Sequence, residues 1–231
     1  LLDSNHLISP RNASAVRKLI EHNVTCVLAS GRMHESILRY ARQLGLNAPI
    51  ISYNGSMIKL SGSNEAIYHK RLPVDLAREI VSYCQKNGHH LNYYCDDRLY
   101  VDKLNEWTAI YHSQTGSDIH PVGDLKTLTC LEPTKLILID NPATISKLLI
   151  EMKERFSDSL YITTTNPEYL EFMNPEANKG SALKWLSQRL GIPQAQTMAF
   201  GDNLNDIAML QWAGTSIAMG NAKPEVKAVA H

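Results

Sequence analysis

The sequence predicts an α/β protein with a parallel-sheet core covered by helices and a second, α+β domain inserted into it. Short apolar runs alternate with helical patterns in residues 1–60 and again in 175–231, as in βαβ units. Residues 61–174 instead combine two hairpin-like pairs of strands with helices. We therefore expect a discontinuous core made of 1–60 and 175–231, with 61–174 as the inserted domain.

The composition is that of an ordinary globular protein. The 231 residues are 44% hydrophobic and 20% charged, which excludes a disordered chain. The formal net charge of zero does not favour nucleic acid or an anionic membrane as a partner, and no apolar run approaches a membrane span. The four cysteines, which are Cys26, Cys84, Cys95 and Cys130, form no CxxC pair and indicate neither a zinc site nor disulfides. We expect a cytoplasmic protein.

In the first part of the core, the helices are marked by their end signals. Ser9 is a suitable N-cap and Pro10 a suitable first helical residue, and Asn23 can end this helix. Val16, Leu19 and Ile20 would form its apolar face. The elements expected next are a buried parallel strand over 24–29, a helix over 35–44 closed by Gly45, and a strand over 49–52 leading to a tight turn at Asn54-Gly55.

The second part of the core repeats this alternation. Leu183, Leu186 and Leu190 share one face of a helix over 179–190, which Gly191 would end. The elements expected after it are a strand over 197–200, a helix over 206–212, a strand over 216–219 and a last helix from Pro224.

The inserted domain is expected to contain one sheet covered on one side by helices. Two hairpins are predicted, Leu91–Tyr94 with Leu99–Val101 and Tyr161–Thr163 with Tyr169–Met173. The other expected elements are strands over 66–68 and 135–139 and helices over 74–87, 103–113 and 142–156.

The most informative stretch of the chain starts at Gly201, directly after a predicted strand. Asp202, Asn203, Asn205 and Asp206 follow within five residues, before a helical pattern resumes. Two carboxylates at the carboxyl end of a strand suit Mg²⁺, which proteins hold through one or two carboxylates plus phosphate and water. The alternative is an N-capped helix with an acid in its first turn. The stretch alone does not decide between the two.

Three further positions could contribute to the same site. The backbone and hydroxyl of Ser30-Gly31-Arg32 could bind phosphate at a strand end, although Ser30 could also simply cap the next helix. Lys179 lies at a helix start, where the dipole disfavours a cation; it could hold phosphate oxygens or a carboxylate, or be a solvated surface residue. Asn54 is expected in a hairpin turn. The sequence does not decide whether it also contacts a substrate.

The candidate residues are expected to lie close together. Ser30, Lys179 and Asp202 each come at a strand end or an adjacent helix start, and these ends meet at one edge of a parallel sheet. A hydroxyl, an ammonium group and a carboxylate for Mg²⁺ are the groups that a phosphoryl-transfer site requires. The sequence therefore indicates phosphoryl-transfer chemistry.

Five stretches resemble the motifs of the haloacid-dehalogenase-like hydrolases, in particular their Cof-type, sugar-phosphatase-like branch. They are Leu28-Ala29-Ser30-Gly31-Arg32, Tyr53-Asn54-Gly55-Ser56, Tyr169-Leu170-Glu171-Phe172-Met173, Asn178-Lys179-Gly180 and Gly201-Asp202-Asn203-Leu204-Asn205-Asp206. Their order and spacing match over nearly the whole chain. The resemblance implies a Rossmann-like core with a large inserted α/β cap. It also implies Mg²⁺-dependent hydrolysis of a phosphate monoester through an aspartyl-phosphate.

The resemblance also implies roles for single residues. Lys179 would neutralise the nucleophile and the phosphate, Asp202 would bind Mg²⁺, and Asp206 would support the metal site. Together with Ser30, Lys179 and Asp206 would be catalytic. The residues expected to contact phosphate or substrate are Ser30, Gly31, Arg32, Asn54, Lys179 and Asn205, and those expected at the metal are Asp202 and Asp206.

The chain departs from the family at its start. The family's first motif, Asp-x-Asp-Gly-Thr, is followed by Leu-Leu, and Leu1-Leu2 resembles the end of that motif. The nucleophilic aspartate and the general acid/base two residues later would then precede Leu1, and Asp3 would be out of register. We expect residues 1–231 alone to be unable to form the covalent intermediate.

The leading hypothesis is a phosphatase acting on a small phosphorylated metabolite, such as a sugar phosphate, as a monomer or small homo-oligomer. The alternatives are a phosphohexomutase-like phosphotransferase and a non-catalytic phosphate-binding protein. A third, the phosphorylation domain of a cation pump, is disfavoured because no membrane span is predicted. In the cap, the candidates for substrate specificity are Tyr93, Asp96, Asp97 and Arg98.

Overall fold

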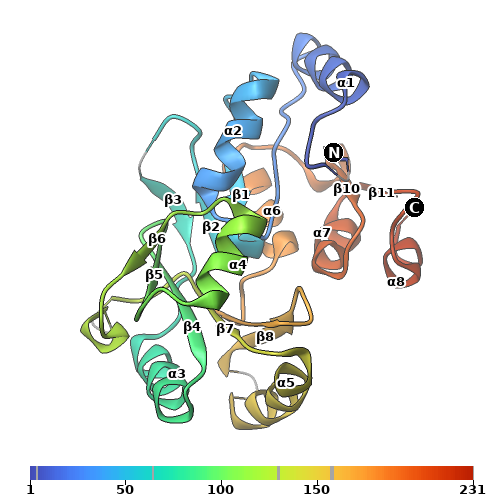
Figure 1. Cartoon of the computed structure of the whole chain (residues 1–231). Coiled ribbons are helices and arrows are strands. Elements are labelled where there is room, and N and C mark those ends of the chain that lie inside the picture. The colour runs from blue at the N-terminus through green and yellow to red at the C-terminus, as the bar shows by residue number, and fades with distance from the viewer. Residues whose placement is uncertain (4, 64, 129–130, 157–158, 231) are drawn as a thin grey trace. The chain divides into compact units, whose positions relative to one another are not determined.

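The computed structural model describes residues 1–3, 5–63, 65–128, 131–156 and 159–230 (Figure 1); Cys130 lies outside them. These residues divide into two compact units, Leu1–Tyr68 with Asn178–His231, and His69–Ala177. The predicted insert, 61–174, differs from the second unit at both ends. At its start the reason is a strand over 66–69 that joins a sheet of the first unit.

The first half of the first unit contains two helices and a three-stranded sheet. α1 (Pro10–Glu21) begins as predicted, since the Ser9 hydroxyl accepts a hydrogen bond from Asn12 N at 3.2 Å. α2 (His34–Leu44) ends at Gly45, whose φ is 69°. The sheet has the order β1 (Ile50–Ser52), β2 (Met57–Lys59) and β3 (Ala66–His69). β1 and β2 are antiparallel, which confirms the predicted turn.

The apolar face predicted for α1 is largely exposed, and one prediction about this half is wrong. No residue of α1 is buried: Leu19 and Ile20 are exposed, and the helix packs on the apolar cluster around α2 through Val16. The run over 24–29 forms only one parallel bridge, from Ala29 to Ile51, and its residues are half-buried or exposed. A strand is buried only where elements cover both its edges and faces, and among the described residues only β1 pairs with this run.

The second half of the first unit consists of three helices and a parallel pair of strands. They are α6 (Lys179–Arg189), β10 (Met198–Gly201), α7 (Ile207–Trp212), β11 (Thr215–Ala218) and α8 (Pro224–Lys227). The parallel pairing of β10 with β11 confirms the predicted α/β class. Leu190, predicted to share a helix face with Leu183 and Leu186, is 43% exposed and follows the last residue of α6.

The second unit is built on a six-stranded sheet with the order β6-β5-β4-β7-β9-β8. The strands are β4 (His90–Cys95), β5 (Arg98–Val101), β6 (Ile119–Pro121), β7 (Lys135–Ile139), β8 (Tyr161–Thr164) and β9 (Tyr169–Met173). The helices are α3 (Val74–Asn87), α4 (Glu106–Thr115) and α5 (Pro142–Phe156). Both predicted hairpins, β4–β5 and β8–β9, are present. The first turns through Asp96 and Asp97, with φ of 48° and 60°.

Helices lie on both faces of this sheet (Figure 1). Ile80 of α3 and Ile145 of α5 pack with Tyr93 in one apolar core. On the other face, the Tyr94 hydroxyl donates to the hydroxyl of Tyr111 on α4 at 2.5 Å. The prediction that helices cover only one side is therefore wrong, because α4 folds back over the second face.

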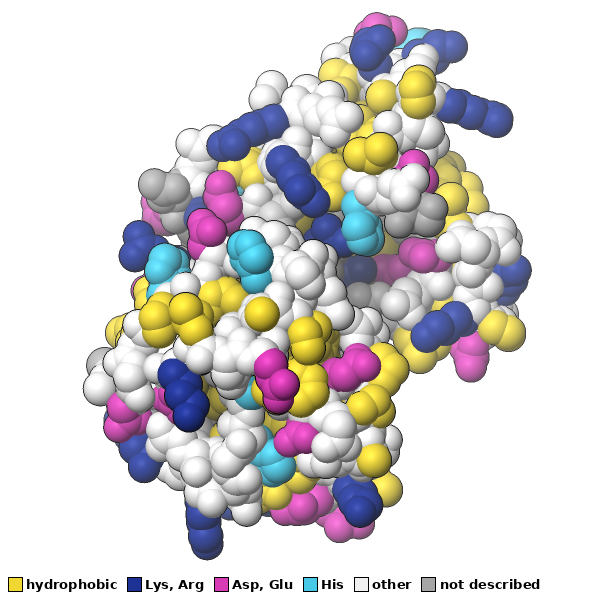
Figure 2. All heavy atoms as spheres, in the orientation of Figure 1, with side chains coloured by type: hydrophobic (Ala, Val, Ile, Leu, Met, Phe, Trp, Pro, Cys, Tyr) yellow, Lys and Arg dark blue, Asp and Glu magenta, His cyan; other side chains and the backbone are white. Residues whose placement is uncertain are grey.

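The molecular surface carries both signs of charge. Basic and acidic side chains are interspersed over the face shown in Figure 2, in keeping with the net charge of zero. That face lacks the continuous basic area typical of nucleic-acid binding. In the part of the chain that the structure describes, no helix combines the length and apolar character needed to cross a membrane.

Candidate active site

The loop that carries Ser30 is joined to the β1–β2 turn through the backbone. Asn54 N donates to Ser30 O, and Tyr53 N donates to Arg32 O, both at 3.0 Å. Gly31 is needed between them, because a Cβ atom there would come within 2.6 Å of Asn54 Oδ1. The Ser30 hydroxyl accepts the N–H of Arg32 at 3.2 Å, so its own proton can be donated to an anion.

Ser30 is not a helix cap. The N-cap residue of α2 is Met33, which lies three residues further along the chain. The alternative interpretation of Ser30 as a capping residue is therefore wrong.

The start of α6 lies against the same β1–β2 turn. Asn178 caps the helix by accepting the N–H of Ser181 on its side chain at 2.7 Å. Gly55 has a φ of 98°, and a Cβ atom at this position would come within 2.3 Å of Asn178 O. Only glycine adopts this conformation without strain and leaves this space. The turn and the helix start therefore hold each other in place, which fixes the backbone of Lys179.

Lys179 and Asp206 form a buried ion pair. Lys179 Nζ lies 2.6 Å from Asp206 Oδ1, and each residue is 5% exposed. The other oxygen, Oδ2, accepts the N–H groups of Asp202 at 3.0 Å and Asn203 at 3.1 Å. A Cβ atom at Gly201 would come within 2.6 Å of Asp206 Cβ. Asp206 thus positions both the loop and the ammonium group, and Lys179 is not a solvated surface lysine.

Asn205 completes the connection between these segments. Its Nδ2 donates to Asn54 Oδ1 at 2.8 Å. Contacts within the first unit therefore gather these sequence-predicted residues: Ser30, Gly31, Asn54, Lys179, Asp202, Asn205 and Asp206.

Asp202 is the carboxylate of this group that faces solvent. It is exposed, and among the described residues its carboxylate has no hydrogen-bond donor or cation as a partner. No cluster of three or more His, Cys, Asp or Glu side chains is found in the described ranges. A single free carboxylate fits Mg²⁺, which retains waters and shares phosphate oxygens. The oxygens of Asp206 already accept three hydrogen bonds, which suits a supporting position.

Arg32 contacts a side chain that is not among the other predicted site residues. Its Nη2 lies 3.2 Å from Nδ1 of His6. Sequence analysis did not single out His6, because it belongs to no motif and lies 26 residues away from Arg32 in the chain. No local pattern could have revealed this contact.

Asp3 has a structural role in the turn that precedes His6. Its Oδ1 accepts the N–H groups of Asn5 and Leu7, both at 2.9 Å. These hydrogen bonds stabilise the turn locally.

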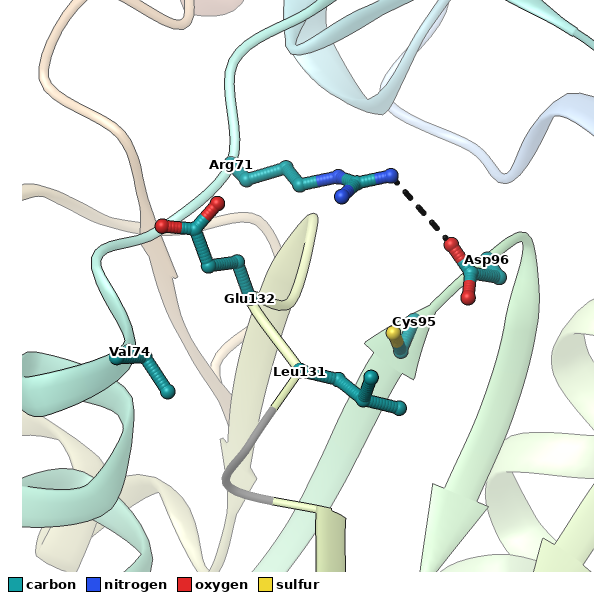
Figure 3. A pocket seen from close by; sticks show the side chains of 6 residues that line it. All are labelled: Arg71, Val74, Cys95, Asp96, Leu131 and Glu132. Atoms are coloured by element: carbon teal, nitrogen blue, oxygen red, sulfur yellow. Dashed lines mark ion pairs between the residues drawn. The ribbon is translucent and has the colours of Figure 1, made fainter.

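The second unit contains a cavity of about 370 Å³, shown in Figure 3. It is lined by Arg71, Val74, Cys95, Asp96, Leu131 and Glu132. Asp96, a predicted specificity residue, pairs there with Arg71 at 3.5 Å. Tyr93, another predicted specificity residue, is fully buried and donates its hydroxyl to Leu131 O. Tyr93 therefore belongs to the apolar core of the second unit.

Comparison with known proteins gives matches over the whole chain. A family model described as haloacid dehalogenase-like hydrolase matches residues 1–231. A Haemophilus influenzae protein named "Putative phosphatase" is 32% identical over 233 residues, which covers 100% of this chain and 87% of that protein. An HMP-PP phosphatase of Serratia proteamaculans is 26% identical over 238 residues, covering 99% of this chain and 83% of that protein.

Solved structures show the same fold. A crystal structure of a Thermotoga maritima protein matches with a TM-score of 0.91 and 31% sequence identity, covering 100% of this chain and 86% of that chain. This match confirms the α/β fold class predicted from the sequence.

Proposed function

We propose that this chain, which belongs to the haloacid dehalogenase-like hydrolase family, is a phosphatase that hydrolyses a phosphate monoester of a small metabolite with Mg²⁺. Relatives named as phosphatases support the reaction class. The observation that carries the proposal is the buried Lys179–Asp206 pair. It fixes an ammonium group beside the loop that presents the exposed carboxylate of Asp202.

The geometry gives each side chain a distinct task. The ammonium of Lys179 would neutralise charge that develops on the transferring phosphoryl group, and the hydroxyl of Ser30 would donate to a phosphoryl oxygen. Fixed charges and dipoles of this kind are the main contribution of a protein to phosphoryl transfer. Asp206 positions Lys179 rather than contacting the substrate, because all its described hydrogen bonds go to protein groups.

Asp202 would hold the metal ion, with Asp206 behind it. When bound, Mg²⁺ polarises the phosphoryl oxygens and offsets their negative charge. Asn205 and Asn54, which are joined at 2.8 Å, would keep the two neighbouring loops at a fixed separation while the substrate binds.

We propose that the nucleophilic aspartate lies in a segment that precedes Leu1. Transfer of the phosphoryl group to that carboxylate would release the alcohol, and water would then hydrolyse the aspartyl-phosphate. Two observations support this placement. Leu1-Leu2 resembles the end of the family's first motif. The carboxylate of Asp3 accepts hydrogen bonds from the backbone of its own turn. A polypeptide of residues 1–231, confirmed by its mass of 25.9 kDa, that hydrolysed p-nitrophenyl phosphate robustly would contradict it.

The proposal is tested by phosphate release from the full-length protein with Mg²⁺. Lys179→Met is expected to abolish turnover, but it also leaves the Asp206 charge buried without its partner, which costs about 3–5 kcal/mol of stability. Lys179→Arg keeps the charge beside Asp206. Its melting temperature and its turnover, compared with those of Lys179→Met, separate the loss of stability from the loss of catalysis. Lys184→Met, on the exposed side of the same helix, is the matched control. Full activity in a folded Lys179→Met variant would refute the assignment.

A further inference from the structure

We propose that His6 and Arg32 form a second anion subsite, so that the preferred substrate carries another anionic group besides the phosphoryl group that is cleaved. The substrate class would be a phosphate monoester that also bears a carboxylate or a second phosphate. This inference rests on the proposed function, because Arg32 belongs to the same loop as Ser30.

The contact between the two side chains determines which imidazole nitrogen can donate to a ligand. Arg32 Nη2 lies 3.2 Å from His6 Nδ1. A guanidinium group has only donors, so a hydrogen bond across this contact takes Nδ1 as the acceptor and leaves Nε2 to carry the proton. The pair then presents the remaining guanidinium N–H groups and the Nε2–H of His6. All of these are donors, which is the requirement of an anion site.

Arg32 has no competing anion among the residues that the structure describes, since it forms no ion pair with a carboxylate there. It is half-buried, with its backbone N–H donated to the Ser30 hydroxyl and its carbonyl accepting from Tyr53. A half-buried guanidinium group without a carboxylate partner binds an anion more strongly than a solvated guanidinium group does.

His6 is held in place by several interactions at a strained backbone position. Its φ is 59°, which is unfavourable for residues other than glycine and is found preferentially at functional sites. The N–H of His6 donates to Asp3 O at 3.0 Å, and its carbonyl accepts the hydroxyl of Tyr40 at 3.2 Å. The Tyr40 hydroxyl in turn accepts from Arg39 at 2.6 Å. These contacts hold the backbone of His6, whose exposed imidazole lies beside Arg32.

The test compares the binding of inorganic phosphate and inorganic pyrophosphate to the chain by isothermal titration calorimetry in metal-free buffer. The wild type is expected to bind pyrophosphate about tenfold more tightly than phosphate, because one charge-assisted hydrogen bond increases affinity by about this amount. His6→Ala and Arg32→Gln should both remove most of this preference, and His6→Ala should leave phosphate affinity within about twofold. His6→Gln, whose amide offers both an acceptor and a donor, should keep part of it.

A matched control is available in His22, which is also exposed but bonds to the carbonyl of Lys18 in its own helix at 2.8 Å. His22→Ala should keep the full preference. An equal affinity of the wild type for both anions, or an unchanged preference in His6→Ala and Arg32→Gln, would overturn the subsite.

Kinetics of the full-length protein distinguish failure of the subsite from failure of the proposed function. Phosphoglycolate and ethyl phosphate differ in one carboxylate. His6→Ala should raise the KM for phosphoglycolate about tenfold, with kcat and the KM for ethyl phosphate nearly unchanged. Turnover with equal KM changes for both compounds refutes the subsite. A lack of turnover, with the pyrophosphate preference intact, refutes the phosphatase and leaves the subsite standing.

Discussion

Acidification is expected to destabilise the protein through His34, a buried histidine at the start of α2. The residue is 2% exposed. Burial, followed by the nearby charge of Lys59, lowers the pKa of its imidazole to about 4. The unfolded chain takes up this proton near the ordinary histidine value of about 6.5. The stability that neutral His34 contributes is therefore fully present above about pH 6.5 and is lost as the pH falls toward 4.

The size of the effect follows from the two pKa values. At about pH 5 the unfolded state is almost fully protonated at this position and the folded state almost fully neutral. The difference corresponds to about 2 kcal/mol of unfolding free energy. For a chain of this length, this lowers the melting temperature by about 4–8 °C.

The assay is urea unfolding of the wild type and of His34→Gln at about pH 7.5 and pH 5. Other groups also titrate in this interval, so the relevant quantity is the difference between the two proteins. The wild type should lose about 2 kcal/mol more than His34→Gln on acidification. His22→Gln, at an exposed histidine, should behave like the wild type. Equal losses in the wild type and His34→Gln would refute the reasoning.

Two further predictions concern the packing of the candidate site. Gly201→Ala places a Cβ atom 2.6 Å from Asp206 Cβ, so it should cost about 1–3 kcal/mol and reduce phosphatase activity. Gly220→Ala, with nothing within 4 Å of the added atom, should do neither, and equal melting temperatures for the two variants would contradict the prediction. Ser56 has a buried hydroxyl without a hydrogen-bond partner among the described residues, so Ser56→Ala should be neutral or stabilise by up to about 1 kcal/mol in urea unfolding. Ser52→Ala removes a buried hydroxyl that is hydrogen-bonded and should cost about 1 kcal/mol; a similar loss for Ser56→Ala would show that its hydroxyl has a partner.

Most helices could be predicted from the sequence because their ends are coded locally. Pro10 begins α1, and Gly45 and Gly88 end α2 and α3 in the left-handed conformation. The strands of the two hairpins in the second unit were predicted from their alternation, and β7 was predicted as a short apolar run; β6 was not predicted. This strand has only three residues and is defined by its parallel pairing with β5, which no local pattern shows.

Burial in the first unit was predicted less well, since it depends on neighbours that are distant in sequence. The apolar residues over 24–29 and on α1 satisfy the patterns of a buried strand and an amphipathic helix. Their actual exposure depends on which elements lie beside them. Val16 packs on the cluster around α2, whereas Leu19 and Ile20, one turn further along the same face of α1, are exposed.

In the candidate site, the sequence could identify the residue types but not most of their partners. Lys179 was noted because a cation at a helix start opposes the dipole, and its pairing with Asp206 supplies the reason for that position. The close approaches at Gly55 and Gly31 could not be derived from a motif. The contact of Arg32 with His6 depends on a turn whose shape the sequence does not specify.

The central claim is tested most directly by phosphate release from the full-length protein as a function of Mg²⁺ concentration, with wild type and Asp202→Asn side by side. The account predicts that the wild type loses its activity in EDTA and regains it with Mg²⁺. It also predicts that Asp202→Asn, which keeps the shape of an exposed side chain, is at least about a hundredfold less active at the same Mg²⁺ concentration. Full activity of the wild type in EDTA, or of Asp202→Asn with Mg²⁺, would contradict the account.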